Sequence, residues 1–180
     1  IGRTRRLYIL LEKEFLKKNM DVLDFSPSRA LYRKLKNNTN IRYFPTDYGG
    51  DFLGDFQYDI TQIDCPDNTF DLIICYHILE HIIEDTKAMS ELFRVLKPGG
   101  KVLIQTPFKE GEIYEDYSVT TEKDRLRCFG QEDHVRIYSV NGLTERLTNV
   151  GFRTEVRIYP QDEYLGMPKD EKVIICTKQV

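Results

Sequence analysis

The sequence predicts an α/β fold in which helices cover both faces of a doubly wound, mostly parallel β-sheet. Apolar runs typical of strands alternate with helical patterns along most of the chain, and such alternation favours parallel sheets. The clearest example is residues 70–107, where an apolar strand, an amphipathic helix and a second strand follow one another. The last two strands have no helix between them, so we expect them to pair antiparallel at one edge.

Composition narrows the class of protein. The chain has 180 residues, enough for one domain with a hydrophobic core. Its net charge of -3 leaves no basic excess for generic nucleic-acid binding, and no apolar run approaches the roughly 18 residues of a membrane span. The four cysteines include no C-x-x-C pair, which disfavours a zinc knuckle. Because no secretion signal is visible, we expect a reducing cytoplasm.

The chain begins with Ile1 rather than Met. We interpret this as processing, or as a fragment that lacks an upstream segment of a single domain spanning residues 1–180.

The first half of the chain predicts two helices and three strands. Apolar residues at helical spacing mark a helix over residues 7–17. A strand over 21–25 leads into a turn where Ser26 is the expected N-cap and Pro27 the first helical residue. That helix ends near residue 37. A strand over 41–45 and a weaker strand over 56–60 follow, separated by a loop rich in Gly and Asp.

The second half predicts the rest of the sheet and one irregular region. The expected elements are a strand from Phe70, helices over 84–96 and 141–150, and strands over 101–106, 152–158 and 172–178. Gly151 closes the second of these helices. Residues 108–140 are polar and aromatic, with one helix near 121–128, and we interpret them as an insertion or lid on the substrate side.

Acidic residues recur where the early strands end. Asp24 lies in the first strand, Asp47 follows the second and Asp59 follows the third. A carboxylate at such a position can accept hydrogen bonds from the hydroxyls of a ribose or the amino group of a base. Asp is also common in turns and caps, but three at successive strand ends favour a nucleoside ligand.

The turn after the first strand contains no glycine. It reads Asp24-Phe25-Ser26-Pro27-Ser28, whereas dinucleotide-binding turns use glycines to let the backbone approach a pyrophosphate. A pyrophosphate ligand is therefore disfavoured. A ligand without phosphates, contacting Ser26 and the helix N-terminus, fits this turn.

The string His77-Ile78-Leu79-Glu80-His81 matches the H-x-x-E-H pattern of one zinc-protease class. The context argues against zinc, because His77 closes a buried strand rather than lying within a helix, and no third ligand stands out. We therefore expect no metal. Two interpretations of His77 and His81 remain open: capping and packing of the helix start, or lining a ligand site.

A second dense cluster runs from Phe129 to Tyr138. Its polar residues lead into an alternating apolar segment that could cross the mouth of the sheet and present His134 and Arg136 to a substrate. The alternative is a surface loop in which the arginine pairs with a carboxylate.

Together these segments resemble class I S-adenosylmethionine-dependent methyltransferases of the type 11 group. The resemblance rests on Pro66-Asp67-Asn68-Thr69-Phe70-Asp71, on the H-x-x-E-H string, and on Glu91-Leu92-Phe93-Arg94-Val95-Leu96-Lys97-Pro98-Gly99-Gly100. It extends from Asp21 to Val180. A branch of bacterial methyltransferase-like proteins is similar also in its Pro-bearing first turn and its segment Phe-Gly-Gln-x-Asp-His-Val-Arg.

The resemblance implies a seven-stranded sheet with an antiparallel last strand and a cleft for S-adenosylmethionine. By this resemblance Asp47 contacts the ribose, and Asp59 and Ile60 contact the adenine. The residues implied at the methionine part and sugar are Asp24, Phe25 and Ser26, followed by Pro27, and those bordering the methyl group are Cys75, Tyr76 and His77.

The function that follows is in-line methyl transfer to an unknown acceptor, with S-adenosylhomocysteine as product. A base near neutral pKa would assist where the acceptor is a hydroxyl or amine; the candidates are His134, then His77 and His81. The charge favours a small-molecule acceptor over nucleic acid. Two alternatives stay open: an inactive methyltransferase-like binding module and a dinucleotide oxidoreductase, which the missing glycines disfavour.

Overall fold

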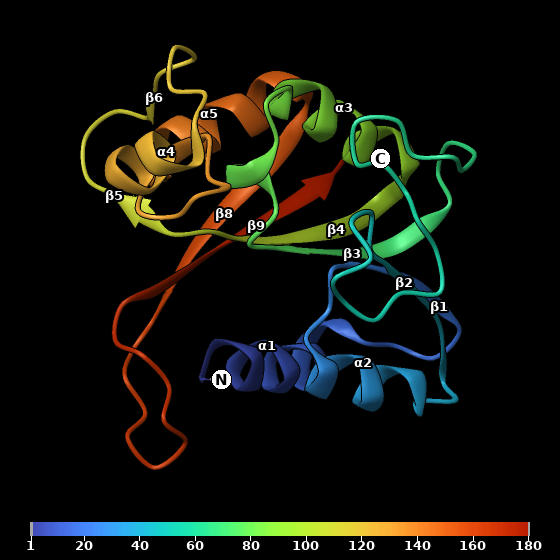
Figure 1. Ribbon diagram of the computed structural model, residues 1–180. Helices are drawn as coiled ribbons and strands as arrows, with labels where there is room; N and C mark the ends of the chain where they lie inside the picture. Colours follow the sequence, from blue (N-terminus) through green and yellow to red (C-terminus); the bar gives the residue numbers. More distant parts are fainter. Residues whose placement is uncertain (1, 180) are drawn as a thin grey trace.

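The computed structural model describes residues 2–179 and confirms the α/β fold (Figure 1). Its central sheet has six strands in the order β2-β1-β3-β4-β9-β8. Their bounds are β1 (Met20–Phe25), β2 (Ile41–Thr46), β3 (Phe70–Tyr76), β4 (Leu96–Gln105), β8 (Phe152–Tyr159) and β9 (Glu171–Lys178). Residues 1 and 180, the ends of the predicted domain, lie outside the described part.

The strand directions agree with the predicted topology. Strands β2, β1, β3 and β4 are mutually parallel, and β9 is antiparallel to both β4 and β8. The antiparallel last strand is therefore confirmed. It lies inside the sheet, between β4 and β8, so that β8 forms the edge.

The seventh strand, predicted over residues 56–60, does not form. Phe56 makes one isolated parallel bridge to Thr46, and Asp59 makes an isolated antiparallel bridge to Gln62. The Thr46 hydroxyl donates to the Phe56 carbonyl (3.2 Å) and accepts from the Tyr58 amide (2.8 Å). Phe56 does make two backbone bonds to β2, donating to the Pro45 carbonyl and accepting from the Asp47 amide. Because the Thr46 hydroxyl takes the next amide, that of Tyr58, the pairing stops at one bridge and the segment crosses the end of β2 as a loop.

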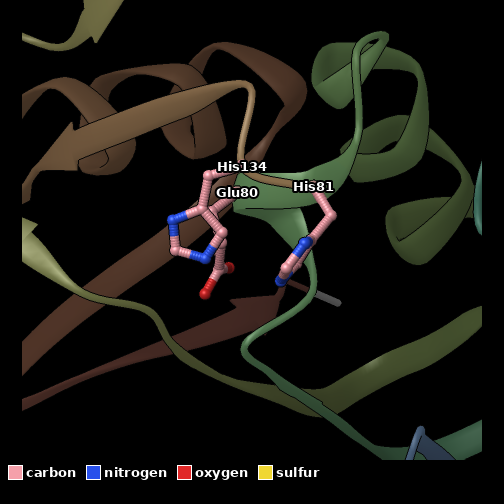
Figure 2. Close-up of side chains that lie close together, drawn as sticks. All are labelled: Glu80, His81 and His134. Carbon is pink, nitrogen blue, oxygen red and sulfur yellow. The ribbon is translucent and has the colours of Figure 1, made fainter. Parts of the chain in front are cut away.

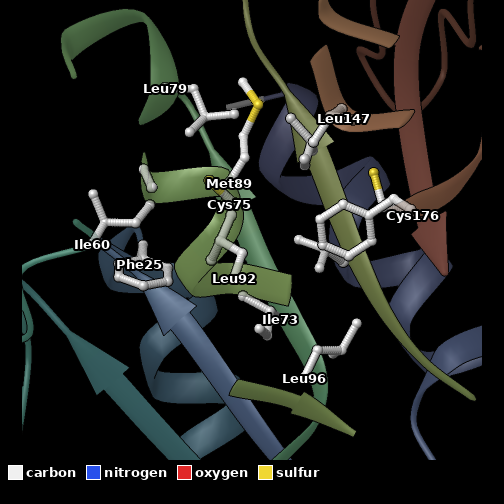
Figure 3. Packing of buried hydrophobic residues seen from close by; sticks show 14 of the residues in the cluster. Phe25, Ile60, Ile73, Cys75, Leu79, Met89, Leu92, Leu96, Leu147 and Cys176 are labelled. Atoms are coloured by element: carbon white, nitrogen blue, oxygen red, sulfur yellow. The ribbon is translucent and has the colours of Figure 1, made fainter. Parts of the chain in front are cut away.

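Helices cover both faces of the sheet. On one face lie α1 (Gly2–Leu10), which continues as a π-helical turn over Leu11–Phe15, and α2 (Arg29–Lys36); on the other lie α3 (Asp85–Val95) and α5 (Val140–Val150) (Figure 1). Each pair of helices buries a separate hydrophobic core against the sheet. Figure 3 shows part of the core beneath α3 and α5, where Cys75, Met89 and Leu92 pack together. The sheet is therefore buried on both faces, as its apolar strands require.

The irregular region predicted over 108–140 forms a small second sheet beside α5. Its strands are β5 (Phe108–Lys109), β6 (Tyr114–Glu115) and β7 (Arg136–Ser139), in the order β5-β7-β6, and α4 (Glu122–Phe129) connects β6 to β7. The predicted helix near 121–128 is thus confirmed within one residue. The role of this region as a lid stays a prediction.

The first helix begins at Gly2, five residues before its predicted start, and two further boundaries differ from expectation for local reasons. The N-cap of α2 is Ser28, whose hydroxyl accepts from the Leu31 amide, so the helix begins after Pro27 rather than at it. Strand β4 begins at Leu96, directly after α3, and its register against β3 shifts between the pairs Phe70–Leu96 and Leu72–Lys101. The extra residues of β4 between these pairs include Gly99, which has φ +79°. Gly151, at φ +117°, closes α5 as predicted.

Among the helices of residues 2–179, none is both long and apolar enough to cross a membrane.

Candidate functional site

A cavity of about 820 Å³ lies at the carboxyl ends of β1, β2 and β3. This is where ligands bind in doubly wound sheets, and the volume lies within the range of roughly 300–1,000 Å³ usual for small-molecule sites. The predicted site residues that line it are Asp24, Phe25, Ser26, Pro27, Asp47, Asp59, Ile60, Tyr76, His77, His81 and His134. The sheet thus gathers residues spread over 110 positions of sequence into one concave site.

Cys75 is the predicted site residue that does not line the cavity. Its neighbours in β3, Ile74 and Tyr76, do line it. Because side chains alternate along a strand, Cys75 points to the opposite face and packs in the core under α3, as Figure 3 shows. Burial raises the pKa of its thiol well above the usual value, so the side chain is a neutral core group.

Asp24 ends up almost fully buried at the end of β1, with 1% of its surface exposed. Its carboxylate accepts a hydrogen bond of 2.7 Å from the Tyr43 hydroxyl. Burial raises the pKa of Asp24 to about 7, and the hydrogen bond offsets only part of that effect. The group therefore changes charge near neutral pH, and a cation placed beside it would favour the ionised form.

The first turn keeps a left-handed residue although it has no glycine. Ser26 has φ +47°, a conformation that favours glycine. Its amide donates to the Thr46 carbonyl and its hydroxyl donates to Asp47, both at 2.7 Å. These two bonds link the turn after β1 to the end of β2. They stabilise a left-handed conformation at Ser26 that a glycine would adopt without strain.

Asp47 is held by donors on two sides. Besides the Ser26 hydroxyl, the Phe52 amide donates to it at 3.0 Å. Burial alone raises the pKa of Asp47, but these hydrogen bonds outweigh it, so its pKa lies below the usual value. The side chain is a fixed carboxylate at the rim of the cavity, oriented by its own loop.

Asp59 and Ile60 lie on the loop that replaces the seventh strand. The hydroxyl and amide of Thr61 both donate to Asp59, and these bonds lower its pKa. Ile60 is buried and packs in the core below. A carboxylate beside an apolar surface suits a flat ring with an amino group.

His77 stands where β3 ends, at φ +56°. Arg3 Nη1 lies 2.8 Å from His77 Nε2, and His77 Nδ1 lies 3.2 Å from Glu80 Oε1. Since arginine can only donate, Nε2 accepts and Nδ1–H donates to Glu80. Both ring nitrogens are therefore hydrogen-bonded to protein groups. His77 is thus a residue that positions Arg3 and Glu80 rather than one with a free nitrogen.

His81 and His134 face each other across the same end of the cavity. Their ring centroids are 4.7 Å apart, and His134 is 4% exposed. Burial and the neighbouring His81 ring lower the pKa of His134, so its imidazole is neutral at physiological pH. Figure 2 shows both rings beside the Glu80 carboxylate.

Arg136 does not face the cavity, contrary to the prediction that it meets a substrate. It is fully buried and donates to the carbonyls of Leu79, Ile82 and Ile83 and to Glu115. The alternative interpretation, an arginine paired with a carboxylate, is closer to the structure, although Arg136 is buried rather than part of a surface loop. Arg136 therefore fixes the turn that carries Glu80 and His81.

Several cavity residues escaped sequence reasoning. Arg3 enters from α1, and the loop after β2 supplies the exposed aromatic side chains of Tyr48 and Phe52, with 70% and 55% of their surfaces accessible. Exposed aromatics in a Gly-rich loop could have been noticed as a signal. Arg3 had none, because only tertiary packing brings α1 to the end of β3.

The chain matches a family model described as "Methyltransferase domain" over residues 3–155. An uncharacterized protein of Methanocaldococcus jannaschii is 28% identical over 142 residues, which cover 73% of this chain and 62% of the relative. A probable S-adenosylmethionine-dependent methyltransferase of Mycolicibacterium smegmatis is 30% identical, over 54% of this chain and 34% of the relative. A ubiquinone/menaquinone biosynthesis C-methyltransferase of Hydrogenovibrio crunogenus is 40% identical, over 29% of this chain and 22% of the relative. The chain thus spans less than two thirds of the length of each of these curated relatives.

Two solved structures show the same fold. The YcgJ protein from Bacillus subtilis superimposes with a TM-score of 0.67 at 15% identity, covering 98% of this chain and 99% of that one. Phosphoethanolamine N-methyltransferase 2 of Haemonchus contortus, solved in complex with S-adenosyl-L-methionine, gives a TM-score of 0.68 at 18% identity, covering 98% and 52%. At these identities the likeness is one of fold alone.

Proposed function

The chain belongs to the class I S-adenosylmethionine-dependent methyltransferase domains, and from that premise we propose that it transfers a methyl group from S-adenosylmethionine to an acceptor bound in the cavity. The products are S-adenosylhomocysteine and the methylated acceptor. One observation supports the proposal above others: the strand-end carboxylates of Asp24, Asp47 and Asp59 line the same cavity as His77, His81 and His134.

The cavity residues suit this cofactor. Asp47 is a held carboxylate for the ribose hydroxyls, and Asp59 with Ile60 suits the adenine. Asp24, with a pKa of about 7, lies where a positively charged sulfonium or ammonium would favour its ionised form. The Ser26-Pro27 turn and Phe25 would complete the pocket around the methionine part.

The bound cofactor supplies a methyl group on a positively charged sulfur, already activated for transfer. The protein then has to align the acceptor and take up its proton. His77 is held by Arg3 and Glu80, so we assign it to positioning. His134 is our first candidate for the base, because its ring is neutral and faces the cavity, and His81 is the second.

The acceptor we propose is a small molecule, since a cavity rather than a basic surface is available. We also propose a cytoplasmic location, which suits four cysteines that are all free. The region 108–140 contributes Gln131, Asp133 and His134 to the cavity wall, which supports its proposed role on the substrate side.

Calorimetry with S-adenosylmethionine and S-adenosylhomocysteine tests the proposal. We expect binding at one site per chain, and substantially weaker binding by Asp47→Ala. No heat at millimolar cofactor with a folded protein would refute it. Weak binding without S-adenosylhomocysteine formation from any acceptor would point instead to an inactive binding module. Once an acceptor is known, unchanged turnover of His134→Ala would remove the base assignment.

A further inference from the structure

Glu80, His81 and His134 bring three metal-binding groups together from two segments far apart in sequence. Glu80 and His81 lie on the 3₁₀ turn η2 (Leu79–His81), and His134 lies just before β7. The Val135 amide donates to the Glu80 carbonyl at 2.9 Å and joins the two segments. One ligand atom from each residue lies within 4.8 Å of the other two. Figure 2 shows the three side chains extending to the same side.

The Glu80 carboxylate lacks a partner for one of its oxygens. The residue is 1% exposed. Its Oε1 is 3.2 Å from His77, whereas its Oε2 is buried and has no hydrogen-bond partner among the described residues. A buried carboxylate left half-satisfied is costly. The nearby Arg136 directs its guanidinium to backbone carbonyls and Glu115 instead. A cation beside Oε2 would remove this cost.

The two imidazoles are arranged as ligands. A metal requires the neutral ring, and the rings of His81 and His134 lie with their centroids 4.7 Å apart. His81 Nδ1 is 3.1 Å from the Asp133 carboxylate. A histidine that binds metal through one nitrogen commonly donates to a carboxylate through the other, so this contact leaves His81 Nε2 free to face the ion.

We propose that Glu80, His81 and His134 bind one divalent transition-metal ion of the zinc type at the acceptor end of the cavity. Two imidazoles and one carboxylate are the ligand set of catalytic zinc sites that keep an open position. Imidazole favours zinc and its neighbours over Mg²⁺, which prefers oxygen ligands and retains its waters. The sequence disfavours zinc on two grounds, that His77 closes a strand and that no third ligand stands out. His77 does lie directly after β3 and is not a ligand in this proposal, and His134 supplies the third group from 53 positions downstream of His81.

Only small side-chain rotations are needed to close the site. Ligand atoms around a tetrahedral zinc ion lie about 3.4 Å apart, given bonds of about 2.0–2.2 Å. The present spacing of up to 4.8 Å therefore has to shrink by at most about 1.4 Å. His81 is only half-buried, so its ring has room to move.

The role of the ion rests on the proposed methyl transfer. At its open position the ion would bind an acceptor hydroxyl and lower its pKa, so that the proton is lost to water. The resulting oxygen forms the O–C bond while the S–C bond of the sulfonium breaks, leaving S-adenosylhomocysteine. The acceptor class that follows is a small molecule with a hydroxyl or enol oxygen. His134 would then act as a metal ligand rather than as the base.

Metal titration of the full chain, freed of metal by a chelator, tests the site. The background is Cys65→Ser/Cys128→Ser, because these two thiols are partly accessible. We expect one equivalent of Zn²⁺ by calorimetry, visible absorption bands with Co²⁺, and no comparable response to Mg²⁺. Imidazole NMR signals of His81 and His134 should shift on adding Zn²⁺. These are readable in the unaltered site, because the chain has only three histidines.

Variants separate ligands from neighbours. His134→Ala and Glu80→Gln should weaken Zn²⁺ binding by more than about 100-fold, beyond the 10- to 100-fold typical of outer-shell changes. The matched control is Glu84→Gln, which changes an exposed carboxylate that pairs with Lys87, and it should bind within about threefold of the parent. Circular dichroism checks that each variant is folded.

Two results would overturn the inference. One is the absence of saturable one-to-one Zn²⁺ binding by the folded chain, and the other is binding that survives His134→Ala. Titration of S-adenosylhomocysteine in the same calorimeter distinguishes the two proposals. Cofactor binding without metal binding would refute the metal site alone. Metal binding without cofactor binding would refute the proposed methyl transfer.

Discussion

The charge of Asp24 depends on pH in the range where the protein is expected to work. Because burial raises its pKa to about 7 in the folded chain, from 3.8 when exposed, the folded state holds a proton that the unfolded state has lost. The contribution of protonated Asp24 to the free energy of unfolding is therefore fully present at low pH and is lost as pH rises from about 4 to 7.

Asp24→Asn should remove this pH dependence and keep an acceptor for the Tyr43 hydroxyl. We expect the variant to exceed the parent in free energy of unfolding above pH 7 by about 2–4 kcal/mol, and to approach it near pH 4. Urea denaturation between pH 4 and 8 measures the difference. Cofactor affinity should increase with pH through 7 in the parent and stay flat in the variant. A stability difference that does not change with pH would contradict the assignment.

Ser26 combines a strained backbone with two useful hydrogen bonds, and two substitutions separate these effects. Ser26→Ala loses the hydroxyl bond to Asp47 and keeps the strain, whereas Ser26→Gly loses the same bond and relieves the strain. Since a left-handed residue costs about 1–2 kcal/mol, Ser26→Gly should be the more stable of the two by about 1 kcal/mol. Thermal denaturation measures this, and equal stability of the two variants would refute the strain.

At the scale of elements, the turn η2 and strand β7 form one unit. Arg136 links them by donating to three carbonyls of residues 79–83, and it pairs with Glu115, which also binds Arg146. This buried cluster, rather than η2 itself, fixes where Glu80 and His81 point. The cluster of Glu80, His81 and His134 is thus positioned by packing between segments.

Arg136→Lys should disrupt this unit because a single ammonium cannot replace a planar fork with five donors. We expect a loss of about 3–5 kcal/mol in the free energy of unfolding, as for other broken buried ion pairs, and faster amide exchange in residues 79–83. The matched control is Arg127→Lys, whose side chain is 79% exposed and pairs with Asp124; it should change stability by less than about 0.5 kcal/mol. Equal effects of the two changes would contradict the role of Arg136.

Element prediction from the sequence succeeded where patterns are periodic and failed where side chains compete with the backbone. Strand β3, helix α3 and the Gly151 cap follow directly from apolar spacing and glycine chemistry. The strand expected over 56–60 stops at the one bridge of Phe56, because the Thr46 hydroxyl takes the Tyr58 amide that would continue the ladder. Pattern reasoning cannot detect such a competition, since it depends on which loop crosses the end of β2.

At the scale of the whole molecule, the cavity was predictable in outline. Residues at the carboxyl ends of parallel strands must meet, and eleven of the twelve predicted site residues do line one cavity. Cys75 fails because strand alternation turns it to the other face. Arg3 and the exact position of His134 could not be foreseen, since α1 and β7 reach the cavity only through tertiary packing.

The central claim is that this cavity holds the cofactor, and a crystal structure of the chain with S-adenosylhomocysteine tests it most directly. We predict density for the nucleoside beside Asp47 and Asp59, with the amino-acid end toward Asp24 and Ser26 and the sulfur facing the histidines. Ligand density outside this cavity, or a nucleoside remote from Asp47 and Asp59, would contradict the account.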